Sequence, residues 1–249
     1  MTVSDTDAVC QYDQYDYQAE FWTGRDYEHQ VEHHLVQQLC QRYVAGETLL
    51  DVGCGFGRLF PAYSASANQF YLVDYSQSML DQAQQAIQSD RVTFQQASVY
   101  ELPTHWPQMD AVIMMRVLHH TPNLDAVFSE LNRVLRPGGV LILEIPNQKH
   151  WLNRLRFRLG RMSHNPHDTT PMALGRLFYN YLPEHVFAVM QQHGFSMEHR
   201  VSHSFFRNPW LKRRVSARVL AGLDRGFQGL LGRYLIAPSL YVVARKTPC

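Results

Sequence analysis

Short apolar runs recur along the first 145 residues, and polar or turn-forming residues bound each of them. Five runs have the length and aliphatic content of buried strands: TLLDV (48–52), FYLVD (70–74), RVTFQQ (91–96), DAVIMM (110–115) and GVLILEI (139–145). A later run, SLYVVARK (239–246), has the same character and predicts a last strand. Runs like these are typical of a parallel sheet that is covered on both faces.

Segments with helical spacing lie between these runs. SQSMLDQAQQAIQ begins at Ser76, a residue type that caps helix N-termini, and repeats apolar residues every three or four positions. NLDAVFSELNRVLRPGG has the same spacing, and we expect Pro137 and Gly138 to end that helix. PEHVFAVMQQHGF predicts a further helix, ended by Gly194. The alternation of strands and helices predicts an α/β fold with a doubly wound sheet.

Three segments lie outside this alternation. The helical rhythm of residues 12–45 predicts a helical N-terminal cap over residues 1–45, ahead of one main domain at 46–249. Two insertions, at about 147–182 and 203–238, mix arginines with apolar residues. The first follows the fifth expected strand, and the second separates the sixth from the seventh. We therefore expect these basic helical insertions at the carboxyl edge of the sheet, where ligands of such sheets bind.

Charge is distributed unevenly along the chain. Residues 1–149 hold 8 Lys and Arg against 18 Asp and Glu, whereas residues 150–249 hold 15 against 4. The basic part either meets an anionic partner or docks on the protein's own acidic half, and the sequence leaves both interpretations open. Nucleic acid is disfavoured as a partner, because no recognised reader motif accompanies the basic residues.

Neither a membrane span nor a metal site is indicated. No run approaches the roughly 18 apolar residues of a spanning helix, and the N-terminal residues are acidic and polar, unlike a signal peptide. We therefore expect a soluble, cytoplasmic protein. The four cysteines are scattered, which predicts reduced thiols. His164, His167 and Asp168 do not have the spacing of a common metal site.

The segment LLDVGCGFGRL (49–59) carries the most specific chemistry. Gly53, Gly55 and Gly57 follow a strand that contains Asp51, so main chain and a carboxylate meet at one strand end. A dinucleotide site has the spacing G-x-G-x-x-G, whereas this loop has G-x-G-x-G. Asp51 would repel a pyrophosphate and attract an ammonium group. Asp74 ends the next strand, at the position from which a carboxylate accepts hydrogen bonds from ribose hydroxyls. These features predict S-adenosylmethionine, a cationic nucleoside, as the ligand.

Successive motifs resemble those of the class I S-adenosylmethionine-dependent methyltransferases that act on small molecules. They are LLDVGCGFGRL, YLVDYSQSML, ASVYELP, MMRVLHHTP and LNRVLRPGGVLILEIPN, and the resemblance covers about residues 45–147. It implies a Rossmann-like sheet of seven strands, mostly parallel with an antiparallel last strand. It also implies that S-adenosylmethionine is the cofactor and S-adenosylhomocysteine the product.

The resemblance assigns roles to individual residues. Gly53, Gly55 and Gly57 border the amino acid part of the cofactor, Asp74 takes the ribose, Tyr75 and Met79 flank the adenine, and Ser98 and Val99 meet its edge. Arg116, within MMRVLHHTP, belongs to the same site. Many relatives have an aspartate where this chain has Ser98, which is a weaker acceptor. FWTGRDYEH resembles the cap that closes over the cofactor, and Arg25 within it would pair with the cofactor carboxylate or lie exposed.

The chemistry of methyl transfer requires few protein groups. His119 and His120 lie just past the fourth strand, where one of them, His120 before His119, would serve as general base. The alternative is that they pack against the cofactor or cap the next helix. The arginine-rich insertions favour a small-molecule or lipid-like acceptor with an anionic part, methylated at oxygen, or contact with a membrane surface. A plain helical cover over the sheet is the alternative.

Two other functions remain open from the sequence. A nicotinamide-dependent oxidoreductase would share the sheet, but Asp51 and the glycine spacing count against it. A non-catalytic cofactor-binding protein or scaffold would share both the sheet and the loop.

Overall fold

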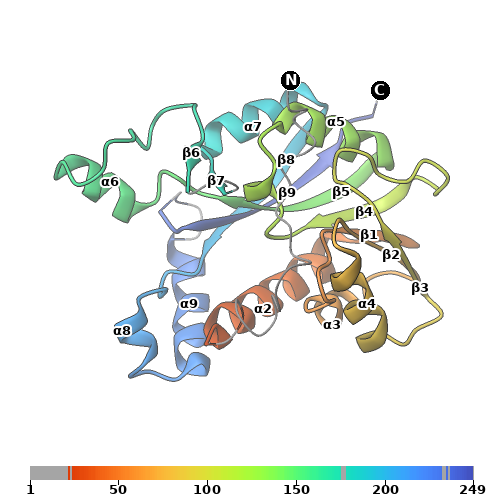
Figure 1. Cartoon of the computed structure of the whole chain (residues 1–249), viewed down its shortest axis with the longest axis horizontal. Coiled ribbons are helices and arrows are strands. Elements are labelled where there is room, and N and C mark those ends of the chain that lie inside the picture. Colours follow the sequence, from red (N-terminus) through yellow and green to blue (C-terminus); the bar gives the residue numbers. More distant parts are fainter. Residues whose placement is uncertain (1–21, 23, 175–177, 232–233, 235, 249) are drawn as a thin grey trace.

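The computed structural model describes residues 22, 24–174, 178–231, 234 and 236–248. Its centre is one seven-stranded sheet with the strand order β3-β2-β1-β4-β5-β9-β8 (Figure 1). The strands are β1 (Thr48–Val52), β2 (Gln69–Asp74), β3 (Val92–Gln96), β4 (Met109–Met114), β5 (Leu135–Pro146), β8 (Phe195–His203) and β9 (Ser239–Lys246). The first five strands pair in parallel, and β9 runs antiparallel to both β5 and β8. The predicted Rossmann-like sheet with an antiparallel last strand is confirmed.

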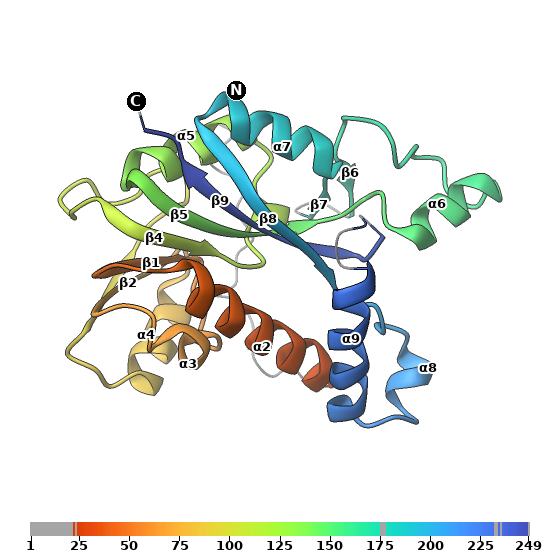
Figure 2. The ribbon, with the colours of Figure 1, turned by 180° about the vertical axis from the view of Figure 1, so that it is seen from behind.

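Helices cover both faces of this sheet, as Figures 1 and 2 show from opposite sides. α5 (Leu124–Val134) and α7 (Pro183–Gln192) pack on one face. α2 (Asp26–Tyr43), α3 (Phe60–Tyr63) and α4 (Gln77–Ala86) pack on the other. The strands in the middle of the sheet are therefore buried on both sides, which explains their continuous apolar sequence.

The expected N-terminal cap is described only in part. Its residues 1–21 and 23 lie outside the described residues, and residues 26–43 form α2. α2 places Val36, Leu39 and Cys40 against the sheet, in the same core as the apolar residues of β1 and β2. Its first turns lie against α9 (Ala217–Leu231), where Tyr27 and Val31 contact Leu220 and Ala221.

One predicted boundary is wrong. The helix expected to reach Pro137 and Gly138 ends at Val134, and β5 begins at Leu135. Proline cannot donate a helical hydrogen bond, and it drives the residue before it, Arg136, towards an extended conformation. The strand therefore begins ahead of the glycine pair, with Leu135 opposite Met109.

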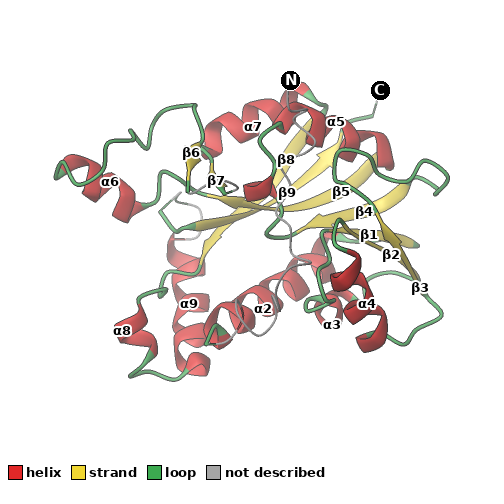
Figure 3. Ribbon diagram, in the orientation of Figure 1, coloured by secondary structure: helices red, strands yellow, loops and turns green. Residues whose placement is uncertain are grey.

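The two insertions leave from the carboxyl ends of β5 and β8, at one end of the molecule (Figure 3). The first contains α6 (Trp151–Arg158) and the short strands β6 (Met172–Ala173) and β7 (Tyr179–Asn180). The second contains α8 (Pro209–Lys212) and α9. No helix in the described part of the chain is long and apolar enough to cross a lipid bilayer.

Candidate active site

The glycine loop turns sharply between β1 and α3. Gly53, Gly55 and Gly57 have φ values of +75°, +54° and +78°, which residues with a side chain rarely adopt. A Cβ atom on Gly53 would lie 2.1 Å from Val117 Cγ2, so this glycine is needed for close packing. A Cβ on Gly55 would meet no atom within 4 Å, so its main chain faces open space. Gly55 is thus the glycine that a ligand can approach.

Asp74, at the end of β2, connects this loop to the start of α4. Its Oδ2 accepts a hydrogen bond from the Gly55 amide at 2.8 Å, and its Oδ1 accepts one from the Ser76 amide at 2.9 Å. Ser76 then caps α4, because its Oγ accepts from the Met79 amide at 3.2 Å. Each carboxylate oxygen has a second lone pair, so Asp74 can accept further hydrogen bonds.

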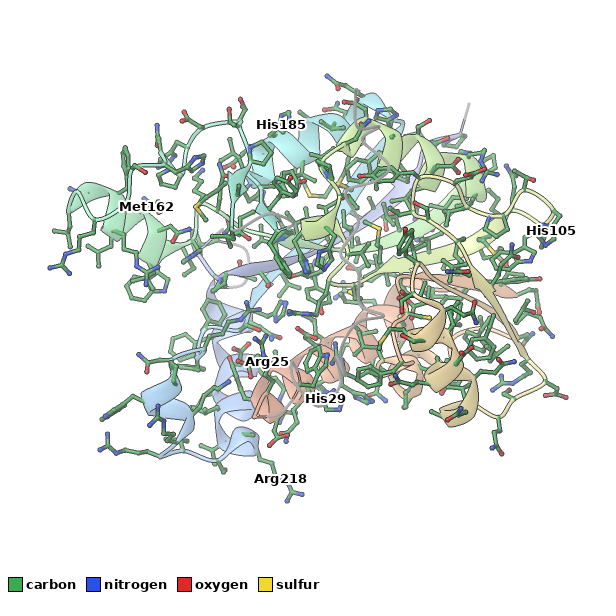
Figure 4. All side chains as sticks on the ribbon, viewed as in Figure 1. Arg25, His29, His105, Met162, His185 and Arg218 are labelled. Carbon is green, nitrogen blue, oxygen red and sulfur yellow. The ribbon has the colours of Figure 1, made fainter. Side chains whose placement is uncertain are left out.

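A cavity opens above the glycine loop and encloses about 1050 Å³ of empty space, part of it open to solvent. It is lined by most of the residues that the sequence assigned to the site: Asp51, Gly53, Gly55, Asp74, Tyr75, Met79, Ser98, Val99, Arg116 and His120. Gly57, His119 and Arg25 are not among the lining residues. Arg25 lies at the N-terminal end of α2, near α9, as Figure 4 shows.

Asp51 is buried at the back of this cavity. Its Oδ2 accepts from the Tyr63 hydroxyl at 2.5 Å. Burial raises the pKa of Asp51 to about 7, although the hydrogen bond from Tyr63 acts in the opposite direction. A cationic group brought next to Asp51 would favour the ionised form, so binding of such a group releases protons near neutral pH.

A buried carboxylate that the sequence analysis missed organises the opposite wall. Glu32 of α2 accepts from Arg58 Nη2 at 2.6 Å and from Arg116 Nη1 at 3.2 Å. Burial alone would raise the pKa of Glu32, but the charges of the two arginines hold it at about 2. The Arg58 guanidinium lies 3.6 Å from the centre of the Trp22 ring. Arg58 and Arg116 both line the cavity, so this wall presents cationic groups to a ligand.

One feature of the sequence marks Glu32. It lies on the apolar face of the predicted N-terminal helix, one turn before Leu35 and Val36, where a charged residue is unexpected.

The two predicted histidines lie side by side, but only one of them lines the cavity. They lie in the 3₁₀ turn Leu118–His120 with ring centroids 4.0 Å apart, and both contact Phe178. His120 lines the cavity, whereas His119 packs flat on Phe178 behind it. Burial, assisted by the charge of Arg116, lowers the pKa of His119 well below its usual value, so this ring is neutral.

Ser98 also lines the cavity, but its hydroxyl is engaged. Its Oγ accepts from the Tyr100 amide at 3.2 Å, closing the turn after β3. One lone pair remains for a ligand donor, fewer than the aspartate of many relatives would offer.

Part of the basic second insertion docks on the acidic half of the chain. Lys212 Nζ lies 2.8 Å from Glu28 Oε1, and both side chains are largely buried. One charge of the insertion is thus neutralised within the protein, whereas Arg213, Arg214 and Arg218 are exposed. The described residues contain no cluster of His, Cys, Asp or Glu that could hold a metal ion, and Cys40 and Cys54 are free thiols. Cys10 and Cys249 lie outside the described residues.

Comparison with known proteins identifies the part of the chain that forms this cavity. The family model described as a methyltransferase domain matches residues 50–143. This segment belongs to the class I methyltransferase family. The cofactor of the family is S-adenosylmethionine. The methyltransferase domain of this chain therefore includes the glycine loop, Asp74 and the two histidines.

Named relatives match the same region. The 27-O-demethylrifamycin SV methyltransferase of Amycolatopsis mediterranei is 41% identical over 106 residues, which are 40% of this chain and 38% of that protein. The ubiquinone biosynthesis O-methyltransferase of Dechloromonas aromatica is 32% identical over 108 residues, 42% of this chain and 47% of that protein. The chain thus spans less than half the length of these two relatives.

A solved structure extends the likeness of the fold to most of the chain. The magnesium protoporphyrin IX methyltransferase of Synechocystis PCC 6803, with S-adenosylhomocysteine bound, superposes with a TM-score of 0.57. The match covers 94% of this chain and 89% of that one at 20% identity. At this identity the comparison describes the fold alone.

The residues of the cavity fit S-adenosylmethionine. The open space at the Cβ position of Gly55 lets a ligand contact the main chain. Asp51 and Asp74 offer carboxylates on the two sides of the loop, and Met79 supplies an apolar surface for a base. The alternative of a dinucleotide is disfavoured by Asp51, a carboxylate beside the glycine loop, where a pyrophosphate would lie.

Proposed function

We propose that the protein transfers a methyl group from S-adenosylmethionine to an oxygen atom of a small-molecule or lipid-like acceptor. The observation that carries this proposal is the cavity in which the Gly55 main chain, Asp51 and Asp74 converge. When bound, the cofactor supplies a methyl group on a sulfonium, which is already activated for transfer. The protein then has to orient the acceptor, exclude water and remove a proton.

In this proposal, different cavity residues contact different parts of the cofactor. Asp74 accepts from the ribose hydroxyls, while Tyr75 and Met79 lie on the two sides of the adenine. Asp51 faces the ammonium group. Arg116, together with Arg58, presents the positive wall to the cofactor carboxylate, with Glu32 keeping both guanidinium groups in place. Ser98 and Val99 meet the adenine edge.

His120 is the proposed general base. It borders the cavity next to Thr121, on the side where β4 ends and the acceptor enters. A neutral imidazole can take the proton of an acceptor hydroxyl. Oxygen as the methylated atom is supported by the names of two relatives, which concern 27-O-demethylrifamycin SV and O-methylation in ubiquinone biosynthesis.

The partner that we propose is an anionic lipid surface. The α6 residues Trp151 and Leu155, with Leu159 just after the helix, form a stripe spaced by four residues, and they are 52%, 43% and 56% exposed. Arg154, Arg156, Arg158 and Arg161 flank this stripe and are also exposed. A helix with an apolar stripe and only cationic charged neighbours fits the boundary between headgroups and acyl chains.

The experiment for the proposed function uses the methyl-labelled cofactor. The full-length protein is incubated with it and with fractionated cell metabolites, and labelled products are identified by mass spectrometry. We expect an O-methylated small molecule and one S-adenosylhomocysteine per product. Binding of NADH in preference to S-adenosylhomocysteine would favour an oxidoreductase. Cofactor binding without any labelled product across all fractions would favour a non-catalytic role.

A further inference from the structure

Polar side chains gather at the carboxyl edge of the sheet, on the face that α2 covers. Four of them each carry one buried polar atom that has no hydrogen-bond partner among the described residues: Glu144 Oε2, Tyr241 OH, His203 Nε2 and Arg207 Nε. We call these four residues the polar cluster. They belong to β5, β9, the last position of β8 and the segment just after it. None of them lines the cavity of the glycine loop.

The pairing of the strands brings the polar cluster together. Glu144 lies opposite Tyr241 in the β5–β9 ladder, and His203 lies opposite Ser239 in the β8–β9 ladder. The ring centroids of His203 and Tyr241 are 4.4 Å apart. Ser239 connects the other two members, because its Oγ accepts from Arg207 Nη2 at 2.8 Å and its hydroxyl acts to lower the pKa of Glu144, against the effect of burial. The four orphaned atoms thus belong to one site.

Without a ligand, such a site lowers the stability of the fold. Buried polar atoms that lack a partner destabilise a fold, and native domains contain few of them. Arg207 adds a positive charge, and it forms no salt bridge within the described part of the chain. Its neighbours Arg58 and Arg116, by contrast, share Glu32. A guanidinium with a buried Nε and no carboxylate partner indicates a site for an anion.

The polar cluster lies within electrostatic reach of residues that line the cofactor cavity. Arg116 lines the cavity, and its charge acts on both Glu144 and His203. The charge of Arg207 reaches His119 and also His150, the N-cap residue of α6. The cluster is therefore within electrostatic reach of both the cavity and the first insertion, and Arg207 itself belongs to the second insertion.

We propose that the polar cluster binds an oxyanion of the methyl acceptor, a carboxylate or a phosphate group, and a hydroxyl next to it. This inference rests on the proposed function. Arg207 Nε and the Tyr241 hydroxyl donate to the oxyanion. The Ser204 hydroxyl lies 2.8 Å from His203 Nδ1 and can donate to it, which leaves the ring proton on Nε2 as a third donor. Glu144 Oε2 accepts from the neighbouring hydroxyl.

The protonation of His203 agrees with this assignment. Burial lowers the pKa of His203 to about 3, and the charge of Glu32 only partly opposes this effect. The ring is therefore neutral near pH 7 and presents one donor, rather than adding a second positive charge beside Arg207.

The test follows the side chain of Arg207 directly by NMR. The full-length protein carries ¹⁵N-labelled arginine and is saturated with S-adenosylhomocysteine. The Nε–H resonance that is absent in Arg207→Lys identifies Arg207. Three probes are titrated: salicylate, which has a carboxylate next to a hydroxyl, phenyl phosphate, and neutral salicylamide. We expect a saturable shift of this resonance with one or both anions and none with salicylamide. The anion that binds more tightly distinguishes a carboxylate from a phosphate.

Variants complete the test. Arg207→Lys keeps the charge but loses the Nε donor, and we expect it to bind the preferred anion roughly tenfold more weakly. Tyr241→Phe removes a single oxygen atom and should also weaken anion binding several-fold. If Arg207→Lys does not fold, the anion affinity of Tyr241→Phe relative to the wild-type protein, measured by calorimetry, still tests the site. The matched control is Arg213→Lys, an exposed arginine, which should bind as the wild type does.

Two results would overturn the anion site. One is the absence of any saturable shift with either anion, which would mean that only water pairs with the polar cluster. The other is unchanged anion affinity in both Arg207→Lys and Tyr241→Phe. Neither result bears on the proposed function, since binding of S-adenosylhomocysteine is measured first and separately. A protein that fails to bind that nucleoside would instead contradict the proposed function.

Discussion

The Asp74 carboxylate accepts a hydrogen bond from the Gly55 amide at 2.8 Å, across 19 residues of sequence. This bond holds the glycine loop against the end of β2, so the two halves of the proposed cofactor site are set before any ligand arrives. A preorganised loop lowers the entropic cost of binding, because less of the main chain has to be ordered.

Replacing Asp74 with alanine should weaken cofactor binding by about 1–3 kcal/mol, since the charge-assisted bonds to the ribose and the loop are both lost. Calorimetric titration with S-adenosylhomocysteine measures this loss. Asp81→Ala, which removes an exposed carboxylate from α4, is the matched control and should bind normally. Equal affinity in the two variants would refute the ribose assignment.

Two glycines of the loop, Gly53 and Gly55, should respond differently to alanine. Gly55→Ala adds about 1–2 kcal/mol of backbone strain but meets no neighbour, so the protein should fold and lose cofactor affinity. Gly53→Ala also collides with Val117, so it should lower the free energy of unfolding by a further 1–3 kcal/mol or so. Urea denaturation and calorimetry separate these outcomes. A Gly55→Ala protein with normal affinity would contradict a ligand at that position.

Cofactor binding should depend on pH through Asp51. Because burial raises its pKa to about 7, ionised Asp51 is formed only as the pH rises through that value. Affinity for S-adenosylhomocysteine, which shares the ammonium group, should therefore increase from about pH 6 towards about pH 7.5. Binding near pH 7 should release protons, which calorimetry in buffers of different ionisation enthalpy can count.

Two variants check this origin of the pH dependence. Asp51→Asn should flatten the profile over the same range. Tyr63→Phe removes the donor that favours the ionised form, so it should move the rise to higher pH. A profile that is identical in wild type and Asp51→Asn would show that another group titrates.

Glu32 should matter for stability as well as for the site. Glu32→Gln removes the buried carboxylate that Arg58 and Arg116 share, which should cost about 3–5 kcal/mol of unfolding free energy. The pKa of Glu32 is lowered from 4.5 to about 2, so its contribution is complete above about pH 4.5 and is lost as the pH falls towards 2. Urea unfolding at several pH values measures both effects.

The control for Glu32 is Glu130→Gln, which breaks a partly exposed pair with Arg133 on α5. That change should lower the free energy of unfolding by less than about 1 kcal/mol. If the two variants were equally stable, Glu32 would contribute no more than a surface carboxylate.

Charge reversal on α6 should release the protein from lipid. Arg156→Glu with Arg158→Glu removes two cationic side chains beside the exposed stripe, and each is worth about 1 kcal/mol near an anionic surface. Sedimentation with phosphatidylglycerol vesicles should show binding weakened at least tenfold or so, with cofactor affinity unchanged. Arg42→Glu with Arg200→Glu changes the net charge equally, away from the insertions, and should have little effect. Equal losses in both variants would indicate nonspecific attraction.

The sequence was sufficient to predict the structure wherever the residues that determine it are neighbours in the chain. Strands β1 and β2 and the turn at Gly53 and Gly55 follow from local apolar runs and from backbone requirements. The end of α5 was misjudged because Pro137 acts on the residue before it, so that the extended conformation begins earlier than the proline itself.

Other features depend on residues that meet only after folding. Glu32 is 26 residues from Arg58 and 84 from Arg116, so no window of sequence connects them. The polar cluster requires the register of β5, β9 and β8, which places Glu144 opposite Tyr241. A one-residue shift of that register would send one of these side chains to the other face of the sheet.

α2 performs two tasks within a single turn. Glu32 faces the arginines of the cavity wall, and Glu28, four residues earlier, is the buried partner of Lys212 from the second insertion. A chimaera that received residues 203–238 of another enzyme would therefore leave Glu28 without its counterion, unless a lysine came with the graft. That insertion therefore cannot be exchanged alone, and the helix beneath it has to be redesigned with it.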